Sequence, residues 1–198
     1  INHSKGLIFY LHGNGGSLKG WGNDADVYLA NDYDVFMLDY RGYGKSTGNI
    51  TSEEQLNNDI QTTYKHLLTR YPENKIIILG YSIGTGPATL LASNNAPRQL
   101  ILQAPYYSLT DLMSHWYPIV PPYVLKYKFE TFKHLKKVKC PITIFHGNED
   151  KVIYYNSSVK LQKYFKATDE LITIKRQGHG GIRHHPTYLK NIEILLKE

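Results

Sequence analysis

A serine flanked by glycines lies between an apolar strand pattern and a helix pattern. The stretch reads Gly80-Tyr81-Ser82-Ile83-Gly84. It follows a short apolar, β-branched run at residues 75–79 and precedes a helix pattern at residues 85–92 that begins with small residues. A strand that turns this sharply into a helix needs neighbours the size of glycine, because larger side chains would push the two backbones apart. The sequence therefore predicts a fold in which a strand leads directly into a helix, with Ser82 at the turn.

Strand patterns and helix patterns alternate along the whole chain. Short apolar runs predict strands at 7–11, 35–40, 76–79, 100–103, 142–145 and 171–174. Their weak alternation is typical of strands buried on both faces. One intervening helix pattern begins with capping residues at Thr51 and has an apolar face from Leu56 to Leu68, and others lie near 159–165 and 188–196. This order predicts the α/β class, with a mostly parallel, twisted sheet of about six strands and helices on both faces.

The sequence also predicts how the chain is divided. No linker-like segment interrupts the alternation, so we expect a single domain over residues 1–198. Residues 106–137 form a longer insertion between two predicted strands, and Pro118, Pro121 and Pro122 exclude one long helix there. Long insertions in compact domains usually have a functional role. We expect a cap of short helices and turns, although its aromatic residues would equally well pack onto the sheet edge.

Composition excludes several classes of function. Apolar residues make up 41% and charged residues 20% of the chain, as in ordinary globular proteins. The net charge is +6, and the one basic cluster, Lys133, Lys136, Lys137 and Lys139, is interpreted as a solvated face, with attraction to anionic lipid or an acidic substrate as the alternative. The absence of nucleic-acid motifs and repeats predicts no nucleic-acid partner. A single cysteine, Cys140, excludes an internal disulfide, and no apolar run is long enough to span a bilayer.

The first residues of the sequence are relevant to where in the cell the protein is found. Residue Ile1 stands only a few positions before the first predicted strand, with no initiator methionine. We therefore expect an upstream segment, such as a signal peptide or an anchor, to be missing. Membrane association is expected only through such a segment. The sequence leaves the cellular compartment and the oligomeric state open.

Ser82 is a candidate nucleophile, and a serine hydroxyl needs a base and a carboxylate that orients the base. The carboxylate candidate is Asp150, in the loop 146–150 that directly follows the predicted strand 142–145, so it falls at the same sheet edge as Ser82. Glu149 is its neighbouring rival. Asp39 also follows a strand pattern, but an aspartate beside Arg41 is expected to brace a loop.

The base candidate is His179, which stands between Gly178 and Gly180 after the last predicted strand. These glycines let the loop reach over the sheet edge. His184 and His185 are rivals, but they belong to the approach to the terminal helix pattern. Along the chain the order is therefore serine, aspartate, histidine, unlike the orders in the chymotrypsin and subtilisin types.

Backbone N–H groups near this edge are candidates for an oxyanion hole. One belongs to Ile83, at the start of the helix after Ser82, and the other to Asn14, in the glycine-rich stretch at 12–16 that follows the first predicted strand. A phosphate-binding loop is not expected, because Gly44-Lys45-Ser46 has Asp39 where the P-loop pattern GxxxxGK[ST] requires its first glycine, and no GxGxxG pattern occurs. Residues expected to contact substrate come from the same loops and the insertion: Gly13, Tyr81, Tyr106, Trp116 and Tyr117.

Taken together, these motifs resemble the α/β-hydrolase superfamily over essentially the whole chain, and more narrowly the Bem46 and ABHD13/ABHD17-like branch of serine hydrolases. The matching motifs lie at 11–16, 38–46, 80–84, 146–150 and 178–179. The resemblance implies an α/β-hydrolase fold and a serine hydrolase that acts on esters or thioesters, some relatives removing acyl groups from lipidated proteins, with no metal and no organic cofactor. Family members usually have one or two strands before the His-Gly strand, so we expect N-terminal edge strands to be missing here.

The expected activity is hydrolysis of a carboxylic ester or thioester through an acyl-enzyme intermediate, on a small-molecule or acyl substrate. One alternative is a small serine peptidase or aminoacyl hydrolase of the prolyl-oligopeptidase type, which shares this fold and triad. Against it, the sequence shows neither a propeller domain nor an acidic pair to bind an amine. The other alternative is a non-catalytic binding module on a hydrolase scaffold, which an intact triad disfavours. Fold alone does not decide between these functions.

Overall fold

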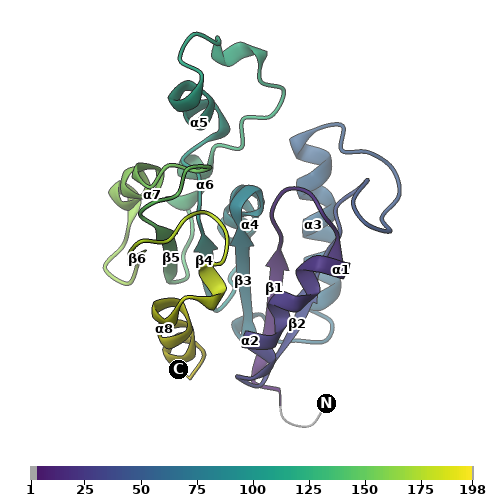
Figure 1. Cartoon of the computed structure of the whole chain (residues 1–198). Coiled ribbons are helices and arrows are strands. Elements are labelled where there is room, and N and C mark those ends of the chain that lie inside the picture. The colour runs from purple at the N-terminus through teal and green to yellow at the C-terminus, as the bar shows by residue number, and fades with distance from the viewer. Residues whose placement is uncertain (1–3, 198) are drawn as a thin grey trace.

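One six-stranded parallel sheet forms the centre of the computed structural model, which describes residues 4–197. The strands are β1 (Gly6–Leu11), β2 (Tyr33–Met37), β3 (Ile76–Tyr81), β4 (Gln99–Gln103), β5 (Ile142–Gly147) and β6 (Glu170–Ile174). They lie in the order β2-β1-β3-β4-β5-β6. The connections leaving the neighbouring strands β1 and β3 therefore run in opposite directions, which opens a crevice between their carboxyl ends, the usual ligand site of such sheets. These ends point toward the top of Figure 1.

Helices cover both faces of the sheet (Figure 1). One face packs against residues of α3 (Glu53–Leu67), α4 (Thr85–Asn94), α6 (Thr131–Leu135) and α7 (Asn156–Leu161). The other packs against α2 (Asp26–Leu29) and α8 (Pro186–Lys197), and the short α1 (Leu18–Trp21) precedes α2. None of the helices within residues 4–197 is both long enough and apolar enough to cross a membrane. The predicted α/β architecture is confirmed.

The two covered faces explain why the strand sequences are apolar throughout. In β1, Leu7 and Phe9 belong to the core on the α3–α4 face, whereas Ile8 and Tyr10 belong to the core on the α2–α8 face. Successive side chains of a strand point to opposite faces, so a strand covered on both sides buries every residue. All six residues of β1 are accordingly buried.

Helix α3 begins and packs as its sequence pattern predicts. The side-chain oxygen of Ser52 accepts a hydrogen bond from the Gln55 N–H at 3.0 Å, which satisfies one of the free donors at the helix start. Its buried residues recur at helical spacing and form one apolar stripe: Leu56, Ile60, Tyr64 and Leu67. The stripe packs on the sheet and fixes the α3 side of the crevice.

Strand β2 lies earlier than predicted, at Tyr33–Met37 rather than at 35–40. Its last pair with β1 joins Tyr10 to Met37, and β1 ends one residue later. No residue after Met37 pairs with β1. Tyr40 is nevertheless buried, because its ring packs in the core on the α3–α4 face, where its hydroxyl donates a hydrogen bond to the His12 carbonyl at 3.0 Å.

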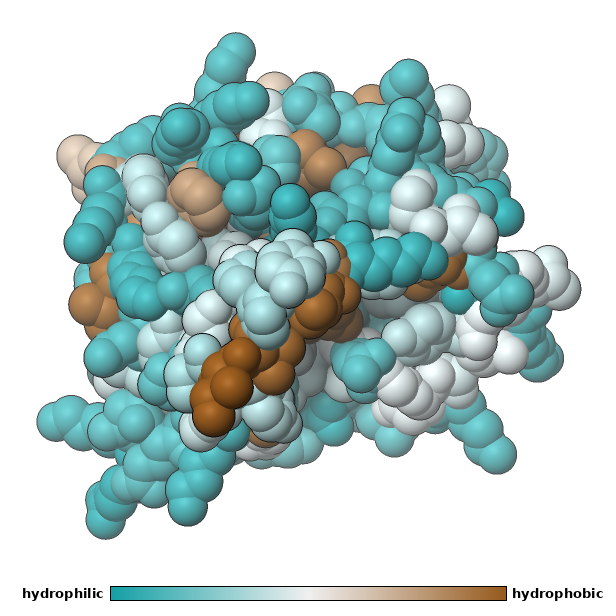
Figure 2. Space-filling model, turned by 90° about the horizontal axis from the view of Figure 1, so that it is seen from above, coloured by the Kyte–Doolittle hydropathy of each residue, from teal (hydrophilic) through white to brown (hydrophobic). Residues whose placement is uncertain are grey.

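The insertion contains α5 (Leu109–Trp116), a 3₁₀ helix at Pro122–Val124 and α6. Ser108 caps α5 by accepting a hydrogen bond from the Asp111 N–H at 3.0 Å. Figure 1 shows α5 above the carboxyl ends of the strands. The insertion exposes several large hydrophobic side chains: Trp116, Tyr117, Ile119, Val120, Tyr123 and Val124. Figure 2, which views the molecule from above, shows hydrophobic residues gathered among polar ones on this face.

Candidate active site

The turn after β3 holds Ser82 in a left-handed backbone conformation, with φ at 53°. The flanking glycines make this turn possible. A Cβ atom on Gly84 would lie 2.2 Å from the Leu11 carbonyl oxygen, and one on Gly80 would lie 2.7 Å from the Ala88 Cβ. Both glycines are therefore required by the close approach of β1, β3 and α4, and the turn presents Ser82 at the crevice.

Ser82, His179 and Asp150 form a continuous chain of hydrogen bonds across three loops. The His179 Nε2 lies 2.9 Å from the Ser82 Oγ, and the His179 Nδ1 lies 2.7 Å from the Asp150 Oδ2. A carboxylate only accepts, so the proton of a neutral His179 lies on Nδ1, and Nε2 accepts from the serine hydroxyl. The structure thus brings together the three residues that the sequence places at one edge of the sheet.

Asp150 is buried and has four donors around it. Its Oδ1 accepts from the Val152 N–H at 2.8 Å and from the Ile153 N–H at 2.9 Å. Its Oδ2 accepts from His179 and lies 3.2 Å from the Nε2 of His146. Burial alone would raise the pKa of Asp150, but the hydrogen bonds from His146 and His179 outweigh burial and hold this pKa well below its usual range. Asp150 is therefore an ionised partner for His179.

His146 is a residue of the site to which the sequence pattern assigns no role. Its side chain is fully buried, and its Nε2 also lies 2.9 Å from the Ile153 carbonyl oxygen. On the other side of the ring, Nδ1 lies 2.7 Å from the Ser158 Oγ. The signal in the sequence is its position at the end of β5, four residues before Asp150, but only the folded turn brings the two side chains together.

The loop after β1 lies on the other side of Ser82. The Asn14 Oδ1 accepts a hydrogen bond from the Tyr43 hydroxyl at 2.7 Å, and the Trp21 Nε1–H donates to the Gly15 carbonyl at 3.0 Å. These contacts fix a glycine-rich loop from two sides. Asn14 and Ile83, the two residues whose N–H groups are oxyanion-hole candidates, both line the cavity beside Ser82.

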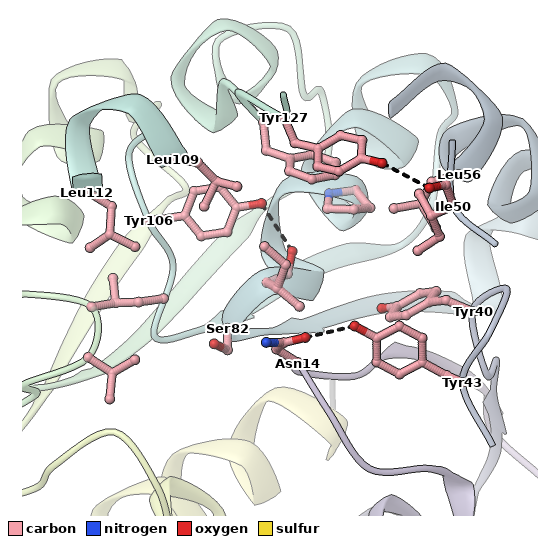
Figure 3. Close-up of a pocket in the computed structure, with 15 residues that line it drawn as sticks. Asn14, Tyr40, Tyr43, Ile50, Leu56, Ser82, Tyr106, Leu109, Leu112 and Tyr127 are labelled. Atoms are coloured by element: carbon pink, nitrogen blue, oxygen red, sulfur yellow. Dashed lines mark hydrogen bonds between the residues drawn. The ribbon is translucent and has the colours of Figure 1, made fainter. Parts of the chain in front are cut away.

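An apolar cavity of about 410 Å³ opens beside Ser82 (Figure 3). Two hydrogen bonds brace its wall, from the Tyr106 hydroxyl to the Ile83 carbonyl at 3.0 Å and from the Tyr127 hydroxyl to the Ile50 carbonyl at 2.9 Å. Its other lining side chains are mainly aromatic or aliphatic: Tyr40, Tyr43, Leu56, Pro87, Leu109, Leu112, Phe129, Val152 and Ile153. None of the described lining residues is acidic. The site can therefore accept an apolar group next to the serine hydroxyl.

The structure separates the five residues expected to contact substrate. Tyr106 lines the cavity. Gly13 and Tyr81 lie against each other outside the lining, and the Tyr81 hydroxyl donates to the His179 carbonyl at 3.0 Å. Trp116 and Tyr117 are 43% and 64% exposed and do not line the cavity.

Helix α5 instead lines the cavity with Leu109 and Leu112, one turn apart on the same side of the helix, which leaves Trp116 and Tyr117 at its far end. The lining residues Ile50 and Leu56 were missed because they come from a loop and a helix that carry none of the motifs. No local pattern in the sequence signals such a contact.

The rival titratable residues lie elsewhere. Glu149 is exposed, and the Nδ1 of His185 accepts a hydrogen bond from the Thr187 N–H at 3.1 Å, at the start of α8. The Asp39 Oδ1 accepts from the Leu18 N–H at 3.0 Å, so this aspartate braces a loop. Within residues 4–197, no group of three or more histidine, cysteine or acidic side chains is arranged to hold a metal ion.

Comparison with known proteins decides the family. The Hydrolase_4 family model, described as serine aminopeptidase, S33, matches residues 2–130. The chain belongs to the α/β-hydrolase family. This α/β hydrolase is 33% identical over 163 residues to the α/β-hydrolase domain-containing protein aho-3 of Caenorhabditis elegans, covering 80% of the chain and 47% of that protein. It is 30% identical over 198 residues to the α/β-hydrolase domain-containing protein 17B of Homo sapiens, covering 96% of the chain and 66% of that protein.

These relatives confirm the resemblance to the ABHD17-like branch. The α/β hydrolase spans about half to two thirds of the length of the curated relatives it matches. Solved structures share its fold. The esterase Pf2001 of Pyrococcus furiosus superimposes with a TM-score of 0.79 at 19% identity, over 99% of this chain and 82% of that one. Est1E of Butyrivibrio proteoclasticus, solved with ferulic acid, superimposes with a TM-score of 0.74 at 18% identity, over 98% of this chain and 88% of that one.

Proposed function

We propose that this α/β hydrolase cleaves carboxylic esters or thioesters through an acyl-enzyme intermediate. The observation that supports the proposal is the hydrogen-bonded chain from Ser82 through His179 to Asp150, which ends beside an apolar cavity. A serine with a base at 2.9 Å and a buried, ionised carboxylate behind that base has the arrangement that activates a hydroxyl.

In this mechanism, the Ser82 Oγ attacks the acyl carbon while the His179 Nε2 takes the hydroxyl proton. Asp150 orients the imidazole and stabilises the imidazolium that forms. The N–H groups of Ile83 and Asn14 hold the negative oxygen of the tetrahedral intermediate, a contribution typically worth about 100- to 1,000-fold in turnover per donor. His179 then donates its proton to the leaving alcohol or thiol. Water repeats the sequence on the acyl-enzyme and releases the acid.

The cavity supports an acyl substrate rather than a charged one. Its wall is apolar and aromatic, and desolvating an ionised group there would be costly without a paired charge. An aliphatic acyl chain would instead gain about 0.8 kcal/mol for each buried methylene. The carbonyl of such a substrate lies next to Ser82 when its chain occupies the cavity.

Labelling by a fluorophosphonate probe tests the nucleophile. We expect the purified wild type to label, and Ser82→Ala and His179→Ala to lose the label. Hydrolysis of p-nitrophenyl esters and acyl thioesters of increasing chain length then measures the activity. A folded wild type that neither labels nor turns over any ester would contradict the proposal and favour the binding-module alternative.

A peptidase is the second candidate, favoured by the description of the matching family as serine aminopeptidase. An aminopeptidase needs a group that binds the free amine of its substrate, and no acidic residue is among the described residues lining the cavity. We therefore expect ester hydrolysis to exceed cleavage of the matching aminoacyl amide. The ratio of the two kcat/KM values, measured on one acyl group, ranks the candidates.

A further inference from the structure

Helix α5 of the insertion contacts the turn that follows Asp150. The indole Nε1–H of Trp116, the last residue of α5, donates a hydrogen bond to the Val152 carbonyl at 3.0 Å. Trp116 does not line the cavity, and the hydrolytic mechanism assigns it no role. Its indole N–H is instead directed to a backbone group two residues from the triad carboxylate.

The same turn supplies backbone donors to Asp150. The Val152 and Ile153 N–H groups both bind the Oδ1, at 2.8 and 2.9 Å. On its inner side the turn is held by His146, whose Nε2 lies 2.9 Å from the Ile153 carbonyl. The turn is thus fixed by a buried histidine on one side and by Trp116 of the insertion on the other.

A second set of contacts fixes α5 along the segment after this turn. Lys160 donates from Nζ to the Asp111 Oδ1 at 2.6 Å, and the Tyr154 hydroxyl donates to the other oxygen of Asp111. The His115 ring stacks on the Tyr154 ring with centroids 3.9 Å apart. Helix α5 therefore lies on residues 152–160 in one defined position, which brings the Trp116 indole to Val152.

We propose that Trp116 is a positioning residue that couples the insertion to the triad. By holding the Val152 carbonyl, it keeps the Val152 and Ile153 N–H groups on the Asp150 Oδ1 and so keeps the Oδ2 directed at His179. Displacement of α5 from the turn would loosen Asp150 and slow the chemical step. This inference rests on the proposed hydrolase function.

Trp116→Phe tests the coupling, because it removes the indole N–H and keeps an aromatic ring. We expect the rate of fluorophosphonate labelling and the kcat for p-nitrophenyl acetate to fall roughly three- to tenfold, the loss that corresponds to one hydrogen bond, with KM unchanged. Tyr123→Phe is the matched control: Tyr123 is an exposed aromatic residue of the same insertion, and we expect its variant to react at the wild-type rate. A wild-type rate in Trp116→Phe would overturn the inference.

Two further measurements separate a role through Asp150 from a general effect on the insertion. In an Asp150→Ala background, Trp116→Phe should cause no additional loss, whereas an equal loss in both backgrounds would place its effect elsewhere. In the otherwise wild-type chain, the low-field proton NMR signal of the His179 Nδ1–H should shift in Trp116→Phe and stay in place in Tyr123→Phe. An unshifted signal in both would overturn the inference. Absence of labelling in the wild type would instead contradict the proposed function.

Discussion

The Ser82 hydroxyl lies 2.9 Å from the His179 Nε2, although 97 positions separate the two residues in the sequence. Ser82 follows β3 and His179 follows β6, so neither local structure nor strand pairing joins them directly. They meet because all six strands are parallel and end at the same edge of the sheet. Their contact leads to predictions about the nucleophile, the carboxylate and the cavity.

Ser82 adopts a left-handed backbone conformation, and comparing the stabilities of two variants measures the free-energy cost of that conformation. Both Ser82→Ala and Ser82→Gly should abolish turnover, since neither has a hydroxyl. Because φ at this position is 53°, which glycine adopts without strain, Ser82→Gly should be more stable than Ser82→Ala by about 1 kcal/mol. Urea unfolding of the two inactive variants measures the difference. Equal stabilities would mean that the turn is unstrained.

Asp150, and not Glu149, should orient the base. Asp150→Asn should lower kcat by about 10⁴-fold, the loss known for the equivalent change in a serine protease triad. Glu149→Gln changes the neighbouring exposed carboxylate in the same way and should leave kcat within about twofold. Steady-state kinetics on one ester compare the two variants. A greater loss in Glu149→Gln would show that the wrong carboxylate was assigned.

The lowered pKa of Asp150 predicts how its contribution to stability depends on pH. The unfolded chain has an aspartate of ordinary pKa, about 3.9, so the folded state favours the ionised form. The stabilisation by Asp150 is therefore complete above that pH and is lost as the pH falls through the folded value. We expect the difference in unfolding free energy between the wild type and Asp150→Asn to shrink steadily as the pH falls below about 4. Chemical denaturation between about pH 5 and pH 2, below the range in which histidine titrates, measures it, and a difference that grew on acidification over this range would contradict the assigned environment.

The cavity should set the preference for acyl length. Leu112 of α5 lines the cavity, and Leu112→Trp would fill part of it. We expect kcat/KM for p-nitrophenyl octanoate to fall at least tenfold relative to the acetate, because the longer chain no longer fits. Leu29→Trp makes the same change at an exposed position of α2 and should leave the ratio unaltered. Equal losses of kcat/KM on both esters in Leu112→Trp would indicate that the substitution damages the catalytic site instead of shortening the cavity.

Much of the fold and the centre of the site follow from local patterns in the sequence. Gly80 and Gly84 mark the turn because backbone atoms of β1 and α4 leave no room for a larger residue, a constraint visible as GxSxG. Apolar runs without alternation mark strands covered on both faces. Parallel strands end at one edge, so a serine, an aspartate and a histidine placed after three of them are predicted to be neighbours, and in the structure they are.

Packing between distant segments decided the rest. The cavity wall combines Ile50, Leu56, Leu112 and Val152, and no sequence period relates residues from a loop, two helices and a turn. The sequence of the insertion favoured Trp116 as a substrate contact, whereas the fold turns its indole toward Val152. The sequence by itself thus determined the parallel sheet, the turn at Ser82 and the residues at the carboxyl edge of the sheet, because backbone sterics and strand direction are local properties. The shape of the cavity and the support of Asp150 were decided only by tertiary structure, because they depend on which side chains meet once the helices have packed on the sheet.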